Sequence, residues 1–377
     1  MNLRRTRAMF RKEFLHIIRD PRSLAAALLQ PLMMLLLFGY ALSLDVDRIP
    51  TVIYDLDRTP VSDALIKDFR GSRYFQIVEE VHNYRPIDRG IDSRRELLGV
   101  VIPDDYSRNL ASGKTAEVQF LLDGSDSNTA SIAMGYAESM IQTYAQNQRE
   151  GAEMSRTGNV VHAPIEPRIR VWYNTDLVSR NFIVPGLIAV ILMIIAAMLT
   201  SLTIAREWEN GTMEQLLSTP VRPVELCVGK LSAYFVLGIV DMLISLFVGM
   251  VVFHVPMRGS PVLLFVSSCV FLFGALSWGI LISAMNRNQL SAYQLCTLTS
   301  FLPAFLLSGF IYSIQSMPLV IQFIALFVPA RYFIDIVKGI FLKGIGLEIL
   351  WFDFLLLLVY GVAMFYLATK KLRQKVA

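Results

Sequence analysis

Six uninterrupted apolar segments, each about 20 residues long, limit the folds open to this chain. They cover residues 24–44, 180–205, 230–253, 261–285, 293–312 and 350–369. A helix of about 20 apolar residues crosses roughly 30 Å of membrane hydrocarbon. The chain is 54% hydrophobic and 18% charged, whereas soluble domains are about 25% charged. The segments therefore exclude a soluble fold and predict a mainly α integral membrane protein with six transmembrane helices.

The distribution of charge gives these helices an orientation. Seven basic residues precede the first segment, and a basic tail, 370–377, follows the last one. Residues 45–179 hold 15 basic and 21 acidic residues, against 20 basic and 10 acidic elsewhere. Because cytoplasmic flanks are enriched in Lys and Arg, we expect both termini in the cytoplasm. The alternative for the first segment is a signal peptide cleaved near Ala41–Ser43.

Residues 45–179 are polar and typical of a soluble α/β domain. Extended runs at 51–54, 74–78, 97–102, 118–122 and 169–172 alternate with helical stretches, the longest from 127 to about 151. The three cysteines, Cys227, Cys269 and Cys296, lie outside this region, which therefore has no disulfide framework. We expect an extracytoplasmic α/β domain inserted between the first two membrane helices.

A shorter apolar run lies between the fifth and sixth predicted spans. Residues 317–328 are bounded by Pro318 and Pro329, and about a dozen residues are too few to cross a membrane. We therefore predict re-entrant or interfacial helices on the outer side, within residues 313–349.

Residues 1–23 are predicted to form an amphipathic interfacial helix on the cytoplasmic side. Phe10, Phe14, Ile17 and Ile18 recur at helical spacing between basic residues, and Pro21 is expected to end the helix. The alternative is a basic segment that only orients the first span.

The cytoplasmic segment 206–229 carries the most explicit local signals. It contains REWENGTMEQLLSTPVRP from Arg206 to Pro223. Gly211 is predicted to end the incoming helix in the left-handed conformation. Thr212 and Gln215 have the spacing of a capping box, and Thr219-Pro220 would stop the new helix after two turns.

This short helix would present an apolar side and an acidic side. Met213, Leu216 and Leu217 share one side, with Glu207, Glu209 and Glu214 nearby. We interpret it as an element that receives force from a cytoplasmic partner, because coupling needs an element with defined alternative positions. The alternative is an ordered loop with no partner.

The sequence offers no catalytic pattern. The four histidines are scattered without metal-ligand spacing, and Gly229-Lys230 lacks the first glycine of a phosphate-binding loop. We expect a transport subunit, not an enzyme, that binds no cofactor, metal or nucleic acid. Asp241 is an acid well embedded in an apolar segment. It is therefore a candidate functional residue, with a packing role as the alternative.

Three stretches together resemble the type 2 ABC-transporter permease family, in its members with a large extracytoplasmic domain between the first two spans. They are KEFLHIIRDPR (12–22), AREWENGTMEQLLSTP (205–220) and, within 308–332, SGFIYSIQSMP and VPARY. The resemblance covers essentially the whole chain, and the second stretch is its most specific part.

The resemblance implies a separate ABC ATPase subunit that contacts the N-terminal helix and the 206–229 segment and that binds ATP and Mg²⁺. The candidate residues of the interfacial helix are Lys12, Glu13, Phe14, Arg19, Asp20 and Pro21. In the segment, the implied coupling role falls on Glu207, Glu209, Gly211, Thr212, Glu214, Leu216, Thr219 and Pro220, beside Leu217 on the apolar side.

The resemblance also implies multidrug-type export from a bacterial inner membrane. The expected partners are the lipid bilayer, a second permease copy or paralogue, and a periplasmic membrane-fusion adaptor. One alternative is a permease for lipid or polysaccharide export. Another is a membrane-anchored ligand sensor, which the short cytoplasmic segments disfavour because they hold no output domain.

Overall fold

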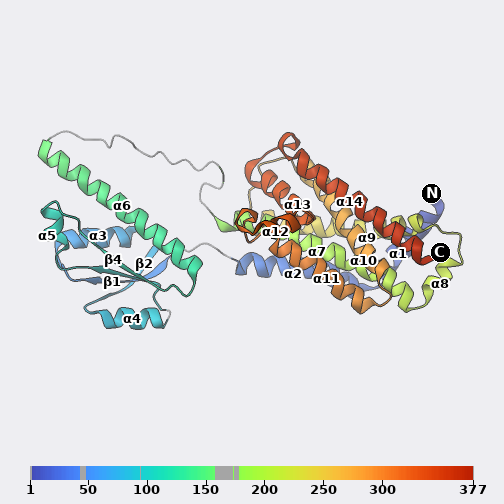
Figure 1. The fold of residues 1–377 in the computed structure, drawn as a ribbon, viewed down its shortest axis with the longest axis horizontal. Helices are drawn as coiled ribbons and strands as arrows, with labels where there is room; N and C mark the ends of the chain where they lie inside the picture. The colour runs from blue at the N-terminus through green and yellow to red at the C-terminus, as the bar shows by residue number, and fades with distance from the viewer. Residues whose placement is uncertain (1, 43–47, 94, 158–172, 174–177, 377) are drawn as a thin grey trace. The chain divides into compact units, whose positions relative to one another are not determined.

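Residues 2–42, 48–93, 95–157, 173 and 178–376 are described by a computed structural model. The chain divides into a helical unit, Met1–Ser43 with Val171–Ala377, and an α/β unit, Leu44–Arg170. Figure 1 shows the two kinds of architecture, helices only in the first unit and a sheet with helices in the second.

The helical unit is built around α7 (Ser179–Glu209), whose residues 183–197 are all buried. Around it pack α2 (Pro21–Ala41), α9 (Pro223–Val251), α10 (Pro261–Met285) and α11 (Gln289–Leu306), while α14 (Leu347–Val376) packs mainly on α10. Small residues allow close packing. At Gly279, an added Cβ would lie 2.2 Å from the carbonyl oxygen of Ala197.

Four helices among the described residues are long and apolar enough to cross a membrane, namely α7, α9, α10 and α14. A fifth would come from α12 (Leu319–Ala325) joined to the helix from Pro329 to Lys343, if that bent pair forms one span. Both α2 and α11 are helical, but α11 ends at Leu306 instead of continuing to 312 as predicted. Six spans therefore stay a prediction.

Within the predicted region 313–349, the short apolar run 317–328 forms one helix, and a second helix follows it after a sharp bend. The pair α12 and α13 (Pro329–Lys338), with α13 extended by a π-helical turn, Gly339–Lys343, is bent by 80°. A single turn, Ile314–Ser316, precedes α12. α13 is anchored by Phe333, which stacks on Phe271 of α10 with ring centroids 4.1 Å apart. A re-entrant loop and a broken span both fit this geometry.

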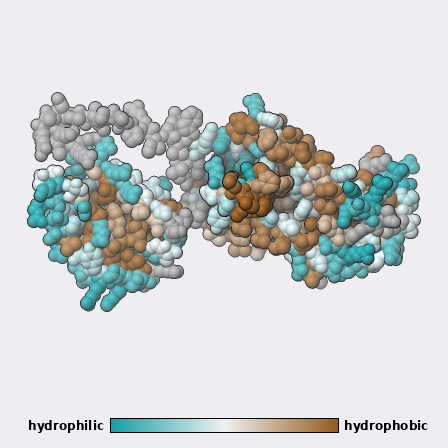
Figure 2. Space-filling model, in the orientation of Figure 1, coloured by the Kyte–Doolittle hydropathy of each residue, from teal (hydrophilic) through white to brown (hydrophobic). Residues whose placement is uncertain are grey.

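The surface of the helical unit is rich in hydrophobic side chains (Figure 2). Along α14 the exposed large side chains include Trp351, Phe352, Leu355, Val359, Val362 and Tyr366. Since an exposed apolar face of this extent is costly in water, it fits contact with lipid.

The α/β unit contains a four-stranded sheet in the order β2-β1-β3-β4. The strands are β1 (Ile49–Asp55), β2 (Phe75–Val81), β3 (Leu98–Ile102) and β4 (Gln119–Leu122). The first three are parallel and β4 is antiparallel to β3. Four of the five predicted extended runs are thus confirmed, and the fifth, 169–172, lies outside the described residues.

Helices cover both faces of this sheet. α3 (Pro60–Gly71) and α6 (Ser127–Thr157) share one core with it, and α4 (Tyr84–Asp92) packs on the other face, while α5 (Tyr106–Ala111) follows β3. Tyr106 is buried in the larger core, where burial raises the pKa of its phenol. The predicted long helix from 127 is confirmed and is longer than expected.

Candidate functional site

The candidate site lies where α1 (Leu3–Arg19), α8 (Thr212–Leu217) and the ends of α7 and α9 meet. Figure 1 shows α1, α8 and both chain termini at the same end of the helical unit. α1 packs along α9, and Gly229 permits this close approach. A Cβ at Gly229 would lie 2.5 Å from Cβ of Met9 and 3.3 Å from the carbonyl oxygen of Thr6.

Four charged residues from these helices form an ion cluster, defined as Lys12, Glu13, Glu207 and Lys230. Nζ of Lys230 donates to Oε1 of Glu13 at 2.6 Å and to Oε1 of Glu207 at 3.3 Å. Nζ of Lys12 donates to the same Glu207 oxygen at 2.6 Å. Two cations and two anions therefore balance while joining α1, α7 and α9.

The ion cluster is buried at its centre and reaches the surface at one edge. The side chain of Lys230 is 1% exposed, and that of Lys12 is 48% exposed. Lys230 also donates to the carbonyl oxygen of Thr203 at 3.3 Å. Removing one partner of a buried ion pair typically costs about 3–5 kcal/mol, because the other charge is left uncompensated. The cluster thus holds these three helix ends in one arrangement.

The turn between α7 and α8 has the conformation that the sequence predicted at Gly211. Its φ is +70°, in the left-handed region, which glycine adopts without the steric cost of a Cβ. α7 ends at Glu209 and α9 begins at Pro223, so the segment between the long helices is shorter than the predicted 206–229.

The predicted capping box is wrong. Gly211 occupies the N-cap position of α8, and no side chain caps that helix. Thr212 instead turns back and donates from Oγ1 to the carboxylate of Glu207. The hydroxyl donates to a charged acceptor of the ion cluster because charge-assisted hydrogen bonds are stronger than neutral ones. Thr212 therefore attaches α8 to the cluster.

The acidic residues of the segment separate into two groups. Glu207 is buried, so it is not part of the exposed acidic surface that the sequence suggested. Glu209 and Glu214 are exposed, as are Gly211, Thr219 and Pro220. We call these five residues the exposed turn surface. Met213 is buried beneath it and Leu216 packs against the same core.

Two further contacts fix the exposed turn surface to neighbouring segments. The carboxylate of Glu209 accepts from the backbone N–H of Gln289 at 2.7 Å, at the start of α11. Arg5 of α1 donates to the carbonyl oxygen of Pro220. A displacement of this surface would therefore be felt by both α1 and α11.

Glu225 provides a second connection between α1 and α9. Its Oε1 accepts from the backbone N–H of Asn2 at 2.6 Å, and its Oε2 accepts from that of Arg222 at 3.1 Å. Arg5 lies 4.0 Å away. Neither Glu225 nor Lys230 was predicted from the sequence as a site residue. The available signal was a charged residue at the start of an apolar segment.

The structure distributes the predicted interfacial residues over several environments. Lys12 and Glu13 belong to the ion cluster, while Phe14 is half-buried and stacks on Phe10 with centroids 5.4 Å apart. Arg19 ends α1, Asp20 is its C-cap and Pro21 begins α2. The predicted stop at Pro21 is therefore confirmed, but the buried side of α1 is formed by Thr6, Met9 and Glu13 rather than by the aromatic stripe.

Asp241 lies within α9, about three helical turns after Lys230 of the ion cluster. It is 2% exposed, and within the described residues neither carboxylate oxygen has a hydrogen-bond partner. The Oγ of Ser245, one helical turn further on, is likewise buried and unpaired there. Such a group is costly in an apolar surrounding, so Asp241 stays a candidate for a role in transport.

A cavity of about 210 Å³ opens beside the ion cluster, between α1, α2, α7, α9 and α11. Its walls are mainly apolar, with Ile195, Leu199 and Leu237, and its polar lining includes Asp20 and Arg206. Across the described parts of the chain, no three His, Cys, Asp or Glu side chains are grouped so that they could hold a metal ion.

Long apolar helices, joined at one end by a buried ion cluster beneath an exposed turn, fit a multi-pass membrane protein. Sequence comparison gives the family: residues 21–370 match the ABC-2 family transporter protein family, and the chain belongs to it. It is 37% identical over 356 residues to the probable multidrug ABC transporter permease YbhS of Escherichia coli, with 91% of this chain and 90% of the relative covered.

Two further relatives from the same organism extend the similarity. The probable multidrug ABC transporter permease YbhR is 32% identical over 368 residues, covering 98% of each chain. The inner membrane transport permease YhhJ is 28% identical over 334 residues, covering 87% of this chain and 86% of the relative.

Proposed function

We propose that this chain is the permease subunit of an exporter that moves drug-like hydrophobic or amphipathic compounds out across a bacterial inner membrane. A separate ATPase subunit supplies the energy. The description of YbhS and YbhR as probable multidrug ABC transporter permeases supports multidrug transport. The description of YhhJ as an inner membrane transport permease supports an inner-membrane location. In this proposal both termini are cytoplasmic and the α/β unit is extracytoplasmic, as the charge distribution favours.

One observation carries the proposal, namely the attachment of the exposed turn surface to three helices through buried charges. Thr212 and Glu207 link α8 to Lys230 of α9 and, through Lys230, to Glu13 of α1. A push on the turn by an ATPase would therefore move the ends of α1, α7 and α9 together, since a balanced ion cluster resists separation. Glu209 and Glu214 would meet basic groups of the ATPase.

The cavity beside the cluster supports an amphipathic substrate. Apolar walls suit a hydrophobic body, and Asp20 and Arg206 provide polar groups at the lining. The cavity lies against the same helix ends that the ion cluster joins, so a movement of α1 relative to α7 and α9 would change its shape. A permease for lipid export would use the same features. Comparing drug and lipid substrates in the same ATP-hydrolysis assay distinguishes the two functions.

The test is substrate-stimulated ATP hydrolysis by the reconstituted permease and ATPase. Glu214→Ala should lower the stimulation, because it removes an exposed carboxylate from the first turn of α8. Glu348→Ala is the matched control, an exposed glutamate in the first turn of α14. Equal stimulation in both variants would refute the role of the turn, and a permease that purifies without any ATPase would refute the exporter.

A further inference from the structure

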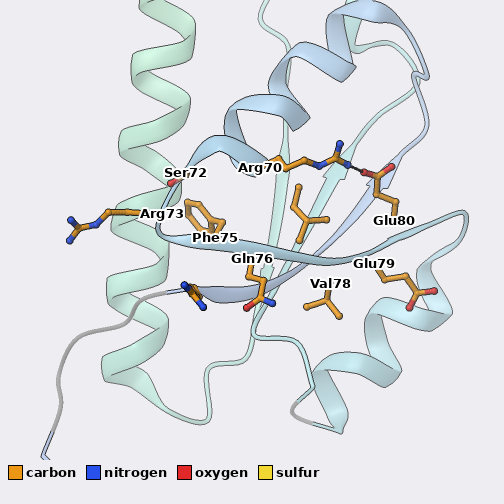
Figure 3. A pocket seen from close by; sticks show the side chains of 10 residues that line it. Arg70, Ser72, Arg73, Phe75, Gln76, Val78, Glu79 and Glu80 are labelled. Atoms are coloured by element: carbon orange, nitrogen blue, oxygen red, sulfur yellow. Dashed lines mark hydrogen bonds and ion pairs between the residues drawn. The ribbon is translucent and has the colours of Figure 1, made fainter.

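The α/β unit exposes the edge of its sheet along β2. This strand pairs only with β1 in the four-stranded order, so its outer N–H and C=O groups have no strand partner among the described residues. Figure 3 shows the groove along this edge, which has a volume of about 780 Å³. Unpaired edges are ready templates for another strand, and proteins usually protect them.

The two ends of this edge carry opposite charge. Arg73 lies just before β2, and Glu79 and Glu80 lie at its other end (Figure 3). Arg48 lines the same groove and directly precedes Ile49 of β1, which pairs with Phe75 at the start of β2. Arg70 forms an ion pair with Glu80, whereas Arg48, Arg73 and Glu79 form no ion pair in the described part of the unit. The edge is therefore basic at one end and acidic at the other.

Such a strand is complementary to itself. We propose that β2 pairs antiparallel with β2 of a second copy of this chain, with Gln76 on the two-fold axis. Arg73 lies in the bend before β2 and Glu79 lies beyond the irregularity at Val78, so these two residues flank the paired run. Around the axis, Arg73 of each copy lies near Glu79 of the other, and two ion pairs form by symmetry. Opposite charges across an antiparallel pair stabilise the pairing, and like charges destabilise it.

A β-bulge explains why the pairing is short and centred before Val78. The register between β1 and β2 shifts there, since Thr51 pairs with Ile77 and Val52 with Glu79. Val78 is left without a partner on β1, and its side chain is 47% exposed. The regular run Phe75 to Ile77 is then the segment free to pair, and its centre is Gln76.

Because both copies are anchored in one membrane, a short contact between the two β2 strands is sufficient for pairing. Two permeases held side by side in one bilayer would raise the effective concentration of one edge for the other, so a weak pairing becomes populated. The inference rests on the proposed function of a permease and on the second permease copy that the family resemblance implies, but it is independent of the ATPase and of the substrate.

Single cysteines in the full chain test the register. The α/β unit has no cysteine between residues 45 and 170, and Cys227, Cys269 and Cys296 are first replaced by Ala. Gln76→Cys should form a disulfide dimer in oxidised membranes, because antiparallel neighbours on the axis are roughly 4.5–5.5 Å apart. Val78→Cys should not, since the two copies of residue 78 are then offset by about 13 Å along the strands.

Ser112→Cys, exposed in the segment after α5, measures random collision. We expect at least about a tenfold higher dimer yield for Gln76→Cys than for this control. Yields that are equal at positions 76, 78 and 112 would overturn the pairing. The proposed function would be untouched by that result if substrate-stimulated ATP hydrolysis persists.

Reversing the charges of Arg73 and Glu79 tests whether the two β2 edges are electrostatically complementary. A double variant that exchanges both charges should restore the pairing. In the Gln76→Cys background, Arg73→Glu and Glu79→Arg should each lower the dimer yield, by roughly threefold to tenfold for two symmetric contacts. The double variant should restore it, because each copy then presents the exchanged charges. Failure of the rescue, with both single variants abundant and inserted, would also overturn the proposal.

Discussion

The two units of this chain use opposite charges in different ways. In the α/β unit, the pair between Arg70 and Glu80 lies at the surface, with side chains 61% and 48% exposed. In the helical unit, Lys230 is almost fully buried between Glu13 and Glu207. Water screens the first pair but not the second. An ion pair is therefore expected to contribute little to the stability of the α/β unit and much to that of the helical unit.

The two units also differ in the interactions that stabilise them. The sheet and its helices form two ordinary apolar cores, with Phe69, Leu98 and Ile102 fully buried. Among the described residues of that unit, the ion pair between Arg70 and Glu80 lies outside these cores. The helical unit concentrates buried charge at one end, around α1, where each buried charge needs a partner within the protein. A substitution in its ion cluster is therefore expected to affect several helices at once.

Lys230→Met should have the largest effect. Without the lysine, Glu13 and Glu207 remain buried next to each other, and we expect a loss of about 3–5 kcal/mol. Arg70→Met in the α/β unit is the matched control, because exposed pairs contribute about 0.2–1 kcal/mol. Thermal midpoints and membrane abundance of the two variants measure the difference. Equal stability would show that the buried cluster is not structural.

A double variant sharpens that comparison. Lys230→Met combined with Glu13→Gln removes one charge of each sign and leaves Lys12 to pair with Glu207. It should recover part of the stability lost by Lys230→Met alone, since the charges balance again. A double variant less stable than the single one would mean that packing of the lysine, not its charge, dominates.

Gly211→Ala should have the next largest effect, and on function more than on abundance. An L-residue at φ +70° is strained by about 1–2 kcal/mol. We therefore expect the turn to shift and ATP hydrolysis to become insensitive to substrate. Gly346→Ala is the control, because that glycine has no positive φ and no heavy atom near an added Cβ. Wild-type coupling in Gly211→Ala would exclude the turn as the transmitting element.

These sites also show what sequence could and could not reveal. The left-handed turn at Gly211 was predictable, because it depends on glycine and its immediate neighbours. The strands β1 to β4 were predictable from short apolar runs between polar helices. Local signals of this kind need no knowledge of the rest of the fold.

The ion cluster depends on tertiary contacts and could not be predicted. Lys230 meets Glu13 only because Gly229 lets α1 approach α9. Thr212 was assigned to a capping box because nothing in the sequence shows that Glu207 turns inward to compete for its hydroxyl. The predicted end of the fifth span failed similarly, since the chain leaves the helix at Leu307 and then turns at Gly309 with φ +77°.

Asp241→Asn should have a smaller effect on stability and a selective effect on transport. A buried carboxylate without a partner is costly, so its removal should leave the thermal midpoint unchanged or raised. Transport should fall if Asp241 meets the substrate. Ser245→Ala, one turn away and also unpaired, serves as the comparison. A lowered midpoint with normal transport would assign Asp241 a packing role.

The smallest effect concerns Asp57 in the α/β unit. Burial alone would raise the pKa of this carboxyl, but hydrogen bonds from Thr59 and Ser107 outweigh it and lower the pKa. The hydroxyls donate at 2.5 Å and 2.8 Å. Folding therefore favours the ionised form. The resulting stabilisation is present above the ordinary aspartate pKa of about 3.9 and is lost as the pH falls through the lower folded value.

Asp57→Asn should flatten this pH dependence without affecting the helical unit. Hydrogen exchange of peptides from β1 and α3, corrected for the intrinsic effect of pH, measures it in the full chain. Wild-type protection should decline on acidification more than protection in Asp57→Asn. Asp68→Asn, exposed on α3, should behave like the wild type. Because Asp57 is only half-buried and solvent screens it, the change should be well below that of Lys230→Met. An equally large response would contradict the contrast between a unit held together by apolar cores and one held at its end by buried charge.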